Sequence, residues 1–326
     1  MRLGIELRGD PAVANRETLA LLVDSGLQAV FLAVEEAQQD LWGLELAEFA
    51  RACRREGLAV VAMPRGYGLV AAAEPDTASP YLHAAPQVWQ IDNRGRRVQR
   101  ACPNHPEFLA WFERRMHDLS EMLACDGVLW DGPGFYYARG SWACRCEYCQ
   151  RGFWVAYEQE MPVELGHQAL HFQQQSVLLL LMAGAAAAKR VNPSAVGMVV
   201  ATPWLAHEQA HMETTYFQQL LGSAAVDVLV VAADWQGMHM GMEDCLSHLV
   251  RAATREATPY GKPVCLRVAG SPDPADRLME AVRFAAHVGC DRLILRDYDS
   301  VLGDRAGAGF EEALKRLARE VAGGET

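Results

Sequence analysis

Short apolar segments alternate with amphipathic segments along the whole chain. Most of the apolar segments are continuous runs, which is typical of strands whose two faces are both buried in a parallel sheet. Eight of them are predicted strands, at residues 3–7, 29–34, 58–63, 127–131, 196–201, 228–233, 264–268 and 292–295. Between them, apolar residues recur at helical spacing, which predicts helices at residues 16–25, 41–56, 106–124, 214–221, 242–257 and 275–288. A last helix is predicted at residues 310–321, after the eighth strand.

Eight strand–helix units in 326 residues predict a single (β/α)8 TIM barrel over residues 1–326. A doubly wound sheet is the alternative, but the first strand is followed by the plain turn Gly9-Asp10-Pro11 and not by a glycine-rich phosphate loop.

Two predicted connections are too long to be simple loops, namely residues 64–106 after the third strand and residues 132–162 after the fourth. The first contains Asn93-Arg94-Gly95 between two β-type segments, a hairpin signal. Both connections follow strands, so both are expected on the carboxyl-end face, where barrel enzymes keep their active sites. We therefore expect the hairpin, with Trp89, to form a wall or lid over the barrel mouth.

The bulk composition, with 51% hydrophobic and 22% charged residues, is that of a globular protein with a sizeable core. A net charge of −11 and the lack of a basic stripe argue against a nucleic-acid partner. No signal peptide is recognisable, and the longest apolar run, residues 177–188, is too short to span a bilayer. A cytoplasmic protein is expected, and its nine cysteines are then expected as thiols or metal ligands instead of disulfides.

Three cysteines of the second insertion, Cys144, Cys146 and Cys149, have a spacing that suits metal ligation by thiolates. A closed tetrahedral zinc site needs a fourth ligand, for which Cys102 in the first insertion is the preferred candidate and His105 the rival. Such a zinc would be structural and would tie the two insertions together. Reduced thiols without a metal are the alternative.

The segment 102–106 (CPNHP), followed by 144–149 (CRCEYC) and Phe153, resembles the zinc-containing β-galactosidase family of (β/α)8 glycoside hydrolases. The resemblance implies that Cys102, Cys144, Cys146 and Cys149 bind one structural zinc above the barrel. That family ends strand four with an Asn-Glu pair and carries a second catalytic Glu at strand seven. This chain has Trp130-Asp131 at the first position and no carboxylate at the second, so the family's catalytic machinery does not carry over.

Two carboxylates at the barrel mouth are what a glycosidase requires. Asp131 after strand four and Asp234 after strand six are the preferred catalytic pair, and their placement resembles that of the retaining α-galactosidase and α-glucosidase clan. Each acid has a structural alternative, because both stand at turns that an Asp can cap, and Glu6 can form a buried ion pair with Arg8.

Other polar and aromatic residues at or after strand ends are predicted to contact the substrate, because sugar rings stack on aromatic side chains. They are Glu6, Arg8, Glu35, Tyr67, Trp89, Trp130, Tyr136, Trp204, Trp235, Arg267, Asp297 and Tyr298.

The sequence thus predicts a glycosidase that acts on a small-molecule or oligosaccharide substrate, with no nucleic-acid or membrane partner and with homo-oligomerisation left open. The first alternative is a barrel that binds a saccharide without hydrolysing it. The second is a metal-dependent enzyme that uses an open three-thiolate site or the pair His207 and His211, which fits a bare HExxH pattern but lacks a third ligand.

Overall fold

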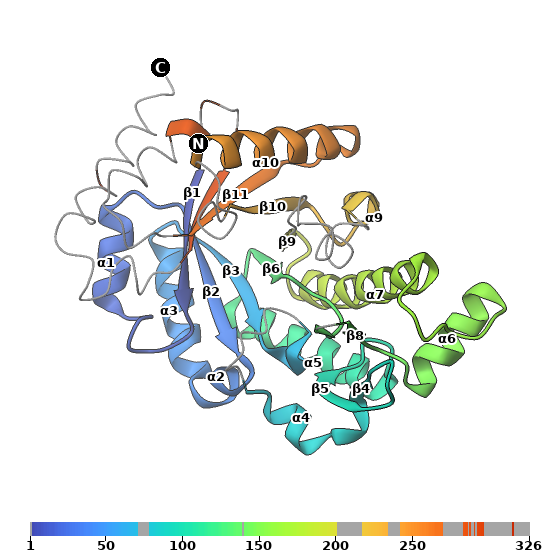
Figure 1. The fold of residues 1–326 in the computed structure, drawn as a ribbon. Helices are drawn as coiled ribbons and strands as arrows, with labels where there is room; N and C mark the ends of the chain where they lie inside the picture. Colours follow the sequence, from blue (N-terminus) through green and yellow to red (C-terminus); the bar gives the residue numbers. More distant parts are fainter. Residues whose placement is uncertain are drawn as a thin grey trace.

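Eight parallel strands close into a barrel in this computed structural model (Figure 1), which describes residues 2–70, 78–138, 140–200, 217–233, 242–269, 283–285, 287, 290, 292–296 and 315. The order around the barrel is β1-β12-β11-β10-β9-β6-β3-β2. The predicted (β/α)8 fold is confirmed. The barrel strands are β1 (Arg2–Arg8), β2 (Ala29–Glu35), β3 (Ala59–Arg65), β6 (Gly127–Asp131), β9 (Val196–Val200), β10 (Val228–Ala233), β11 (Val264–Ala269) and β12 (Arg292–Arg296).

In the part of the chain that the structure describes, helices surround the barrel strands and also occur in the two long insertions. They are α1 (Arg16–Asp24), α2 (Glu36–Leu41), α3 (Gly43–Arg55), α4 (Pro80–Ala84), α5 (Pro106–Leu123), α6 (Glu147–Tyr157), α7 (His167–Val191), α9 (Phe217–Gly222) and α10 (Met242–Ala257), with 3-10 turns at η1 (Tyr67–Leu69), η2 (Pro86–Val88) and η3 (Thr258–Tyr260). The predicted helix 41–56 is interrupted at Trp42, between α2 and α3. The predicted helix 310–321 and most of 275–288 lie outside the described residues.

The sequence of α5 shows why these helices form where they do. Pro106 occupies the first helical position, where its missing N–H costs nothing. Phe108, Phe112, Met116, Leu119 and Leu123 then recur every three or four residues and bury one face. This face packs against α7, whose Gly184 permits the close approach because an added Cβ would lie 3.1 Å from ring atoms of Phe112 and Trp130.

Successive strand residues point alternately toward the helices and into the barrel. The barrel interior holds its own apolar cluster, which includes Phe31, Val61, Met63, Leu129, Val230, Cys265 and Ile294. Asp131 and Arg267 stand two positions beyond the interior residues Leu129 and Cys265, toward the carboxyl ends of β6 and β11. The alternation therefore places both charged side chains inside the barrel, near the face where barrel enzymes act.

The two long segments after β3 and β6 lie side by side at the lower right of Figure 1. In the first, β4 (Trp89–Ile91) pairs antiparallel with β5 (Arg97–Ala101) around the Asn93-Arg94-Gly95 turn. In the second, β7 (Tyr137–Ala138) pairs antiparallel with β8 (Ser141–Trp142). An isolated bridge between Asp92 and Ala143 connects the two segments. Among the described residues, no helix combines the length and the apolar character needed to cross a bilayer.

Candidate functional site

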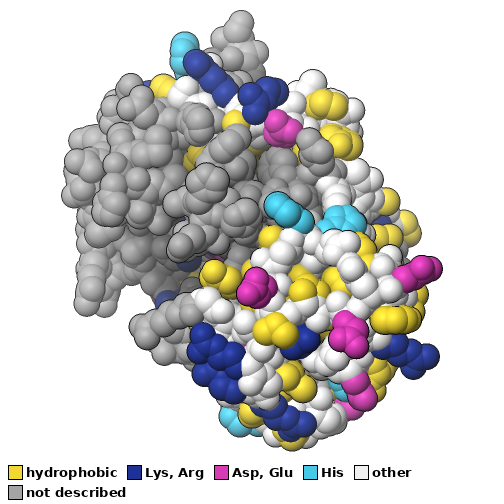
Figure 2. Space-filling model, turned by 45° about the vertical axis from the view of Figure 1, so that its right-hand side comes forward, with side chains coloured by type: hydrophobic (Ala, Val, Ile, Leu, Met, Phe, Trp, Pro, Cys, Tyr) yellow, Lys and Arg dark blue, Asp and Glu magenta, His cyan; other side chains and the backbone are white. Residues whose placement is uncertain are grey.

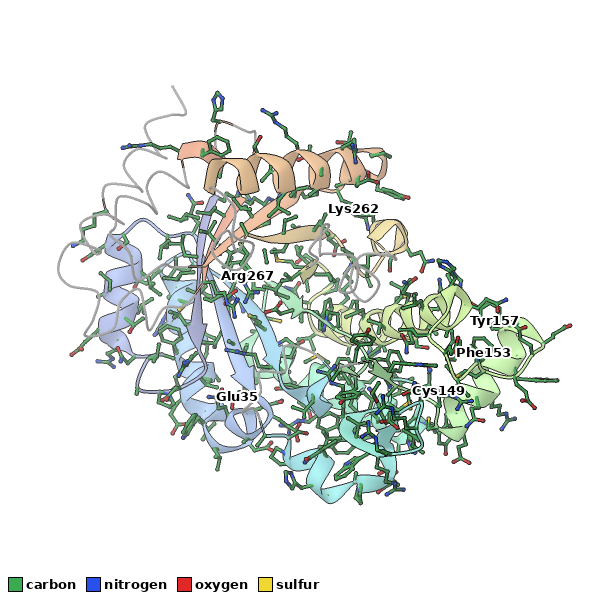
Figure 3. The ribbon with its side chains drawn as sticks, in the orientation of Figure 1. Glu35, Cys149, Phe153, Tyr157, Lys262 and Arg267 are labelled. Carbon is green, nitrogen blue, oxygen red and sulfur yellow. The ribbon has the colours of Figure 1, made fainter. Side chains whose placement is uncertain are left out.

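A buried arginine links two carboxylates across the inside of the barrel. Arg267 on β11 binds both oxygens of Glu6 on β1, through Nε to Oε1 and through Nη2 to Oε2 at 3.0 Å. Its third nitrogen, Nη1, donates to Oδ2 of Asp131 at 2.7 Å. Figure 3 places Arg267 within the barrel. Three strands that are not neighbours in the barrel thus contribute one charged cluster.

The exposure of the three side chains decreases from Asp131 to Arg267. The Asp131 side chain is 23% exposed, that of Glu6 10% and that of Arg267 3%. Burial raises the pKa of Glu6, against the opposing effect of Arg267. Burial by itself would lower the pKa of Arg267, but the two carboxylates outweigh this and raise it, so the guanidinium stays charged.

The contacts of Arg267 and Glu6 change their expected roles. Arg267 directs Nε and both terminal nitrogens to the two carboxylates, and Glu6 uses both of its oxygens on Arg267. Both residues therefore hold other side chains and have little surface left for a sugar. The sequence-based alternative of a Glu6–Arg8 pair is wrong, because the arginine that binds Glu6 comes from β11.

Two of the aromatic residues expected to contact the substrate are fully buried. The hydroxyl of Tyr67 donates to Oε1 of Gln39 at 2.7 Å, and burial raises the pKa of Tyr67. Trp130 packs toward α7, on the side of β6 away from the barrel interior. Neither ring is accessible to a ligand in this structure.

The remaining residues predicted to contact the substrate are partly buried, stand at strand ends, or lie outside the described residues. Trp89 and Tyr136 are half-buried, and the Trp89 indole donates to the carbonyl of Leu82 at 2.8 Å. Arg8 and Glu35 stand at the carboxyl ends of β1 and β2. Asp234, Trp204, Trp235, Asp297, Tyr298, His207 and His211 lie outside the described residues.

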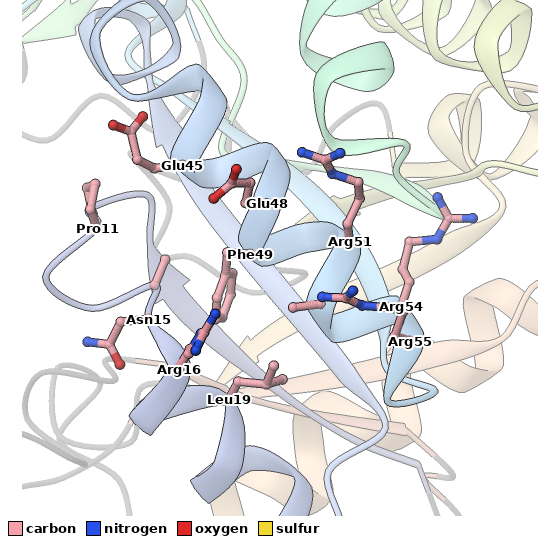
Figure 4. Close-up of a pocket in the computed structure, with 12 residues that line it drawn as sticks. Pro11, Asn15, Arg16, Leu19, Glu45, Glu48, Phe49, Arg51, Arg54 and Arg55 are labelled. Atoms are coloured by element: carbon pink, nitrogen blue, oxygen red, sulfur yellow. The ribbon is translucent and has the colours of Figure 1, made fainter.

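A groove of about 920 Å³ between α1 and α3, shown in Figure 4, contains none of the predicted site residues. Its lining includes Arg16, Glu45, Glu48 and Arg51, which lie on helices of the outer layer. It does not meet the charged cluster inside the barrel, so we do not place the chemistry there.

Four cysteines from the two insertions meet in a second, separate centre. The sulfur atoms of Cys102, Cys144, Cys146 and Cys149 lie within 4.8 Å of one another, and all four residues are buried. Cys102 Sγ is 3.5 Å from Cys146 Sγ and 3.4 Å from Cys149 Sγ. A tetrahedral zinc with Zn–S bonds of about 2.3 Å would space its sulfurs about 3.8 Å apart, so the cluster has the size of a zinc site.

N–H groups of neighbouring residues point to two of the four sulfur atoms. The backbone N–H of Ile91 and that of Cys146 both point to Cys144 Sγ at 3.4 Å, and the Asn104 amide donates to Cys149 Sγ at 3.3 Å. Hydrogen bonds from the other thiols lower the pKa of Cys146, while burial raises the pKa of Cys102 and that of Cys149. Four buried thiolates require a cation to balance them, so this donor set suits a divalent metal ion.

His105, the rival ligand, is not among the four converging side chains. Its ring instead packs edge-on against Tyr148, with ring centroids 4.5 Å apart.

The sequence matches no protein-family model, and no curated protein resembles it at a significant level. The fold, however, is similar to those of solved β-galactosidases. The enzyme from Bacillus circulans sp. alkalophilus has a TM-score of 0.70 and 13% identity, over 99% of this chain and 56% of that one. The enzyme from psychrophilic Marinomonas ef1 has a TM-score of 0.69 and 12% identity, over 99% and 60%.

A catalytic mutant of a GH42 β-galactosidase from G. stearothermophilus has a TM-score of 0.67 and 14% identity, over 98% of this chain and 57% of that one. This chain thus spans somewhat more than half the length of these galactosidases. At such identities the likeness supports the (β/α)8 barrel fold alone.

Proposed function

We propose that the chain is a glycoside hydrolase-like enzyme that acts on a saccharide or glycoconjugate at the carboxyl-end face of the barrel, with Asp131 as the nucleophile. One observation carries this proposal. Arg267 holds Oδ2 of Asp131, whereas Oδ1 has no hydrogen-bond partner among the described residues and the side chain is 23% exposed. A carboxylate fixed through one oxygen and open through the other is prepared for attack at a carbon atom above the mouth.

In the proposed reaction Oδ1 of Asp131 bonds to the anomeric carbon as the bond to the leaving oxygen breaks. That oxygen takes a proton from a second carboxylic acid. Water then attacks the anomeric carbon and gives a proton back to the second acid, and the bond from that carbon to Asp131 breaks. Arg267 acts as a positioning residue, because it fixes the orientation and negative charge of Asp131.

Asp234 is our candidate for the second acid. It directly follows β10, which is separated from β6 only by β9 in the barrel order. We therefore expect the Asp131 and Asp234 carboxylates to lie over the same mouth. Arg8, Glu35, Trp89, Tyr136, Trp204, Trp235, Asp297 and Tyr298 remain candidates for contacts with the sugar.

The zinc in this proposal is structural. Cys102, Cys144, Cys146 and Cys149 would complete its shell, so the metal would hold the two insertions together and would take no part in the reaction. Four converging thiols also weigh against an enzyme that depends on an open three-thiolate site.

A non-hydrolytic saccharide-binding barrel is the second candidate. The observation that favours it is that both acids of the described cluster bind the same guanidinium, which lowers the nucleophilicity of Asp131 and keeps it as a hydrogen-bond acceptor.

Aryl glycosides that differ in sugar and in leaving group test the proposal. Asp131→Asn should lower turnover by about 10³-fold or more, because an amide cannot form the glycosyl–enzyme bond. Asp131→Gly should recover turnover in azide and yield a glycosyl azide of inverted configuration. Asp234→Asn should slow substrates with poor leaving groups more than activated ones. If no aryl glycoside is cleaved but mono- or oligosaccharides bind, the second candidate is correct instead.

A further inference from the structure

A pocket of about 440 Å³ lies beside the cysteine-bearing insertion, outside the charged cluster. Asn93, Tyr137, Trp142, Glu164, Leu165 and His167 line it, and we call it the Tyr137 pocket. We propose that the Tyr137 pocket binds a distal unit of a neutral oligosaccharide whose reacting unit lies at Asp131. This inference rests on the proposed function for its substrate class, but binding at the pocket does not require hydrolysis.

Hydrogen bonds hold the pocket together from three separate chain segments. The Trp142 indole donates to the carbonyl of Val163 at 2.9 Å, and the Asn93 amide donates to the same oxygen at 3.4 Å. The backbone N–H of Asn93 also donates to the carbonyl of Trp142 at 2.8 Å. These bonds join the tip of the β4–β5 hairpin, β8 and the segment before α7. The walls are therefore preorganised, which reduces the entropy lost on binding.

Three of the polar side chains that line the pocket are open to a ligand in the part of the chain that the structure describes. Within the described ranges, the Tyr137 hydroxyl, the Glu164 carboxylate and the His167 imidazole have no hydrogen-bond partner, and Glu164 and His167 are exposed. Leu165 and Leu170 supply apolar surface in the same lining. An aromatic ring, a few polar groups and apolar side chains together match a sugar ring, which has C–H faces and hydroxyl edges.

The charge of the pocket favours a neutral ligand. Glu164 is its only carboxylate, and no Lys or Arg is among its described lining residues. Figure 2, in which the insertion side is turned forward, shows acidic, basic, histidine and hydrophobic side chains intermixed on the described surface. Among the described lining residues, no Lys or Arg side chain would pair with a phosphorylated or uronic-acid chain.

A small crevice of about 20 Å³ adjoins the Tyr137 pocket and includes residues of the strand-four loop in its lining. It is lined by Pro133 and Gly134 at one end, and it shares Tyr137, Trp142, Leu165 and Leu170 with the pocket. Five residues lie between Asp131 and Tyr137, so their Cα atoms are at most about 22 Å apart. An oligosaccharide of a few units is long enough to reach both.

Affinity electrophoresis of the full chain tests this inference without using turnover. The gels contain a soluble β-galactan, β-glucan, mannan or xylan, with polygalacturonate as the acidic comparison. We expect at least one neutral polysaccharide to retard the protein. Tyr137→Ala should weaken this retardation at least about fivefold, since ring contacts contribute about that much affinity, and Tyr137→Phe should keep most of it.

The matched control is Tyr260→Ala, because Tyr260 is also accessible but lies on η3. Hydrolysis is measured separately, so a protein that binds polysaccharide through Tyr137 but hydrolyses nothing would contradict the proposed function and leave the pocket in place. Retardation unchanged in a folded Tyr137→Ala variant, or no retardation by any of the neutral polysaccharides, would overturn the inference.

Discussion

Arg267 is the residue on which the geometry of the mouth depends. Its guanidinium is 3% exposed and lies between two carboxylates from strands on different sides of the barrel. A lysine keeps the charge but cannot reproduce three hydrogen bonds in one plane. The barrel therefore tolerates a buried cation here only because Glu6 and Asp131 surround it.

We predict that Arg267→Met lowers the free energy of unfolding by about 3–5 kcal/mol, because it leaves the Glu6 charge buried and unpaired. Adding Glu6→Gln to this variant should restore part of the loss, since the double variant buries no unpaired charge. Urea unfolding of the single and double variants measures both effects.

The control is Arg255→Met, because the Arg255 side chain is 70% exposed and, among the described residues, pairs with its neighbour Glu256 alone. Arg255→Met should lower the free energy of unfolding by less than about 0.5 kcal/mol. An Arg267→Met variant as stable as this control would show that the cluster does not need the guanidinium.

Sequence reasoning found the acids of this site but not their arrangement. Asp131 and Glu6 were identifiable because each carboxylate interrupts or ends an apolar run at a predicted strand. Their common partner was not identifiable, because Arg267 is 261 residues from Glu6 and only the closure of the barrel brings β1 near β11. Arg267 itself carried a signal, since a lone arginine inside the apolar strand Val264–Ala269 needs a buried partner.

At the scale of elements, one carboxylate organises the turn of the β4–β5 hairpin. Asp92 accepts hydrogen bonds from the backbone N–H of Arg94 at 2.9 Å and of Arg96 at 2.8 Å, and from the Ser141 hydroxyl at 2.8 Å. Burial by itself would raise the pKa of Asp92, but these bonds and the Arg96 guanidinium outweigh it and hold the pKa well below its usual range. Asp92 thus joins the hairpin to β8.

We predict that Asp92→Asn lowers the free energy of unfolding at pH 7 by about 1–3 kcal/mol, because the amide cannot accept all of these bonds. A depressed native pKa stabilises the fold at pH values above the pKa of the unfolded chain, near 3.8, and this contribution is lost as the pH falls toward the native value. The difference between wild type and variant should therefore shrink below about pH 4. Urea unfolding at pH 7 and at pH 3 measures it, and a difference that does not change with pH would contradict this account.

A close backbone approach gives a prediction for β9. A Cβ added at Gly197 would lie 1.9 Å from the carbonyl oxygen of Ala225, which belongs to the segment that precedes β10. Gly197→Ala must therefore displace backbone, and we expect a loss of about 3 kcal/mol or more in thermal unfolding. Gly134→Ala is the control, because nothing lies within 4 Å of the corresponding Cβ. Equal melting temperatures for the two variants would be inconsistent with the structure.

The elements that sequence reasoning missed are those whose signals are local and weak. The short helix α4 and the helix α6 lie inside the two long connections, where turn residues and cysteines dominate the pattern. The barrel strands were found because each is an apolar run that the closed sheet buries on both faces. The burial of Trp130 could not be inferred, because a continuous apolar run does not indicate which residues face the barrel interior. Tyr67 lies on η1 and not in a strand, so its burial depends on tertiary contacts that the sequence does not show.

At the scale of the whole molecule, the four-cysteine centre connects parts of the chain that the barrel holds only at their ends. Cys102 ends the first insertion, and Cys144, Cys146 and Cys149 belong to the second, which also contributes β7 and β8. The Tyr137 pocket lies between the same two insertions. A metal that stabilises their contact would therefore also stabilise the pocket.

We predict about one zinc per chain by elemental analysis of protein purified without added metal, because structural sites bind tightly. Cys144→Ser should lower this ratio several-fold. Cys53→Ala should leave it unchanged, because Cys53 is buried in α3, away from the cluster, and burial raises the pKa of its thiol to about 12. Removal of the metal by a chelator should then open proteolytic cleavage within residues 64–106 and 132–162, while the far-UV circular dichroism of the barrel changes little. Cleavage that begins instead in the barrel strands, or a zinc ratio below about 0.2, would mean that the four thiols hold the insertions together without a metal.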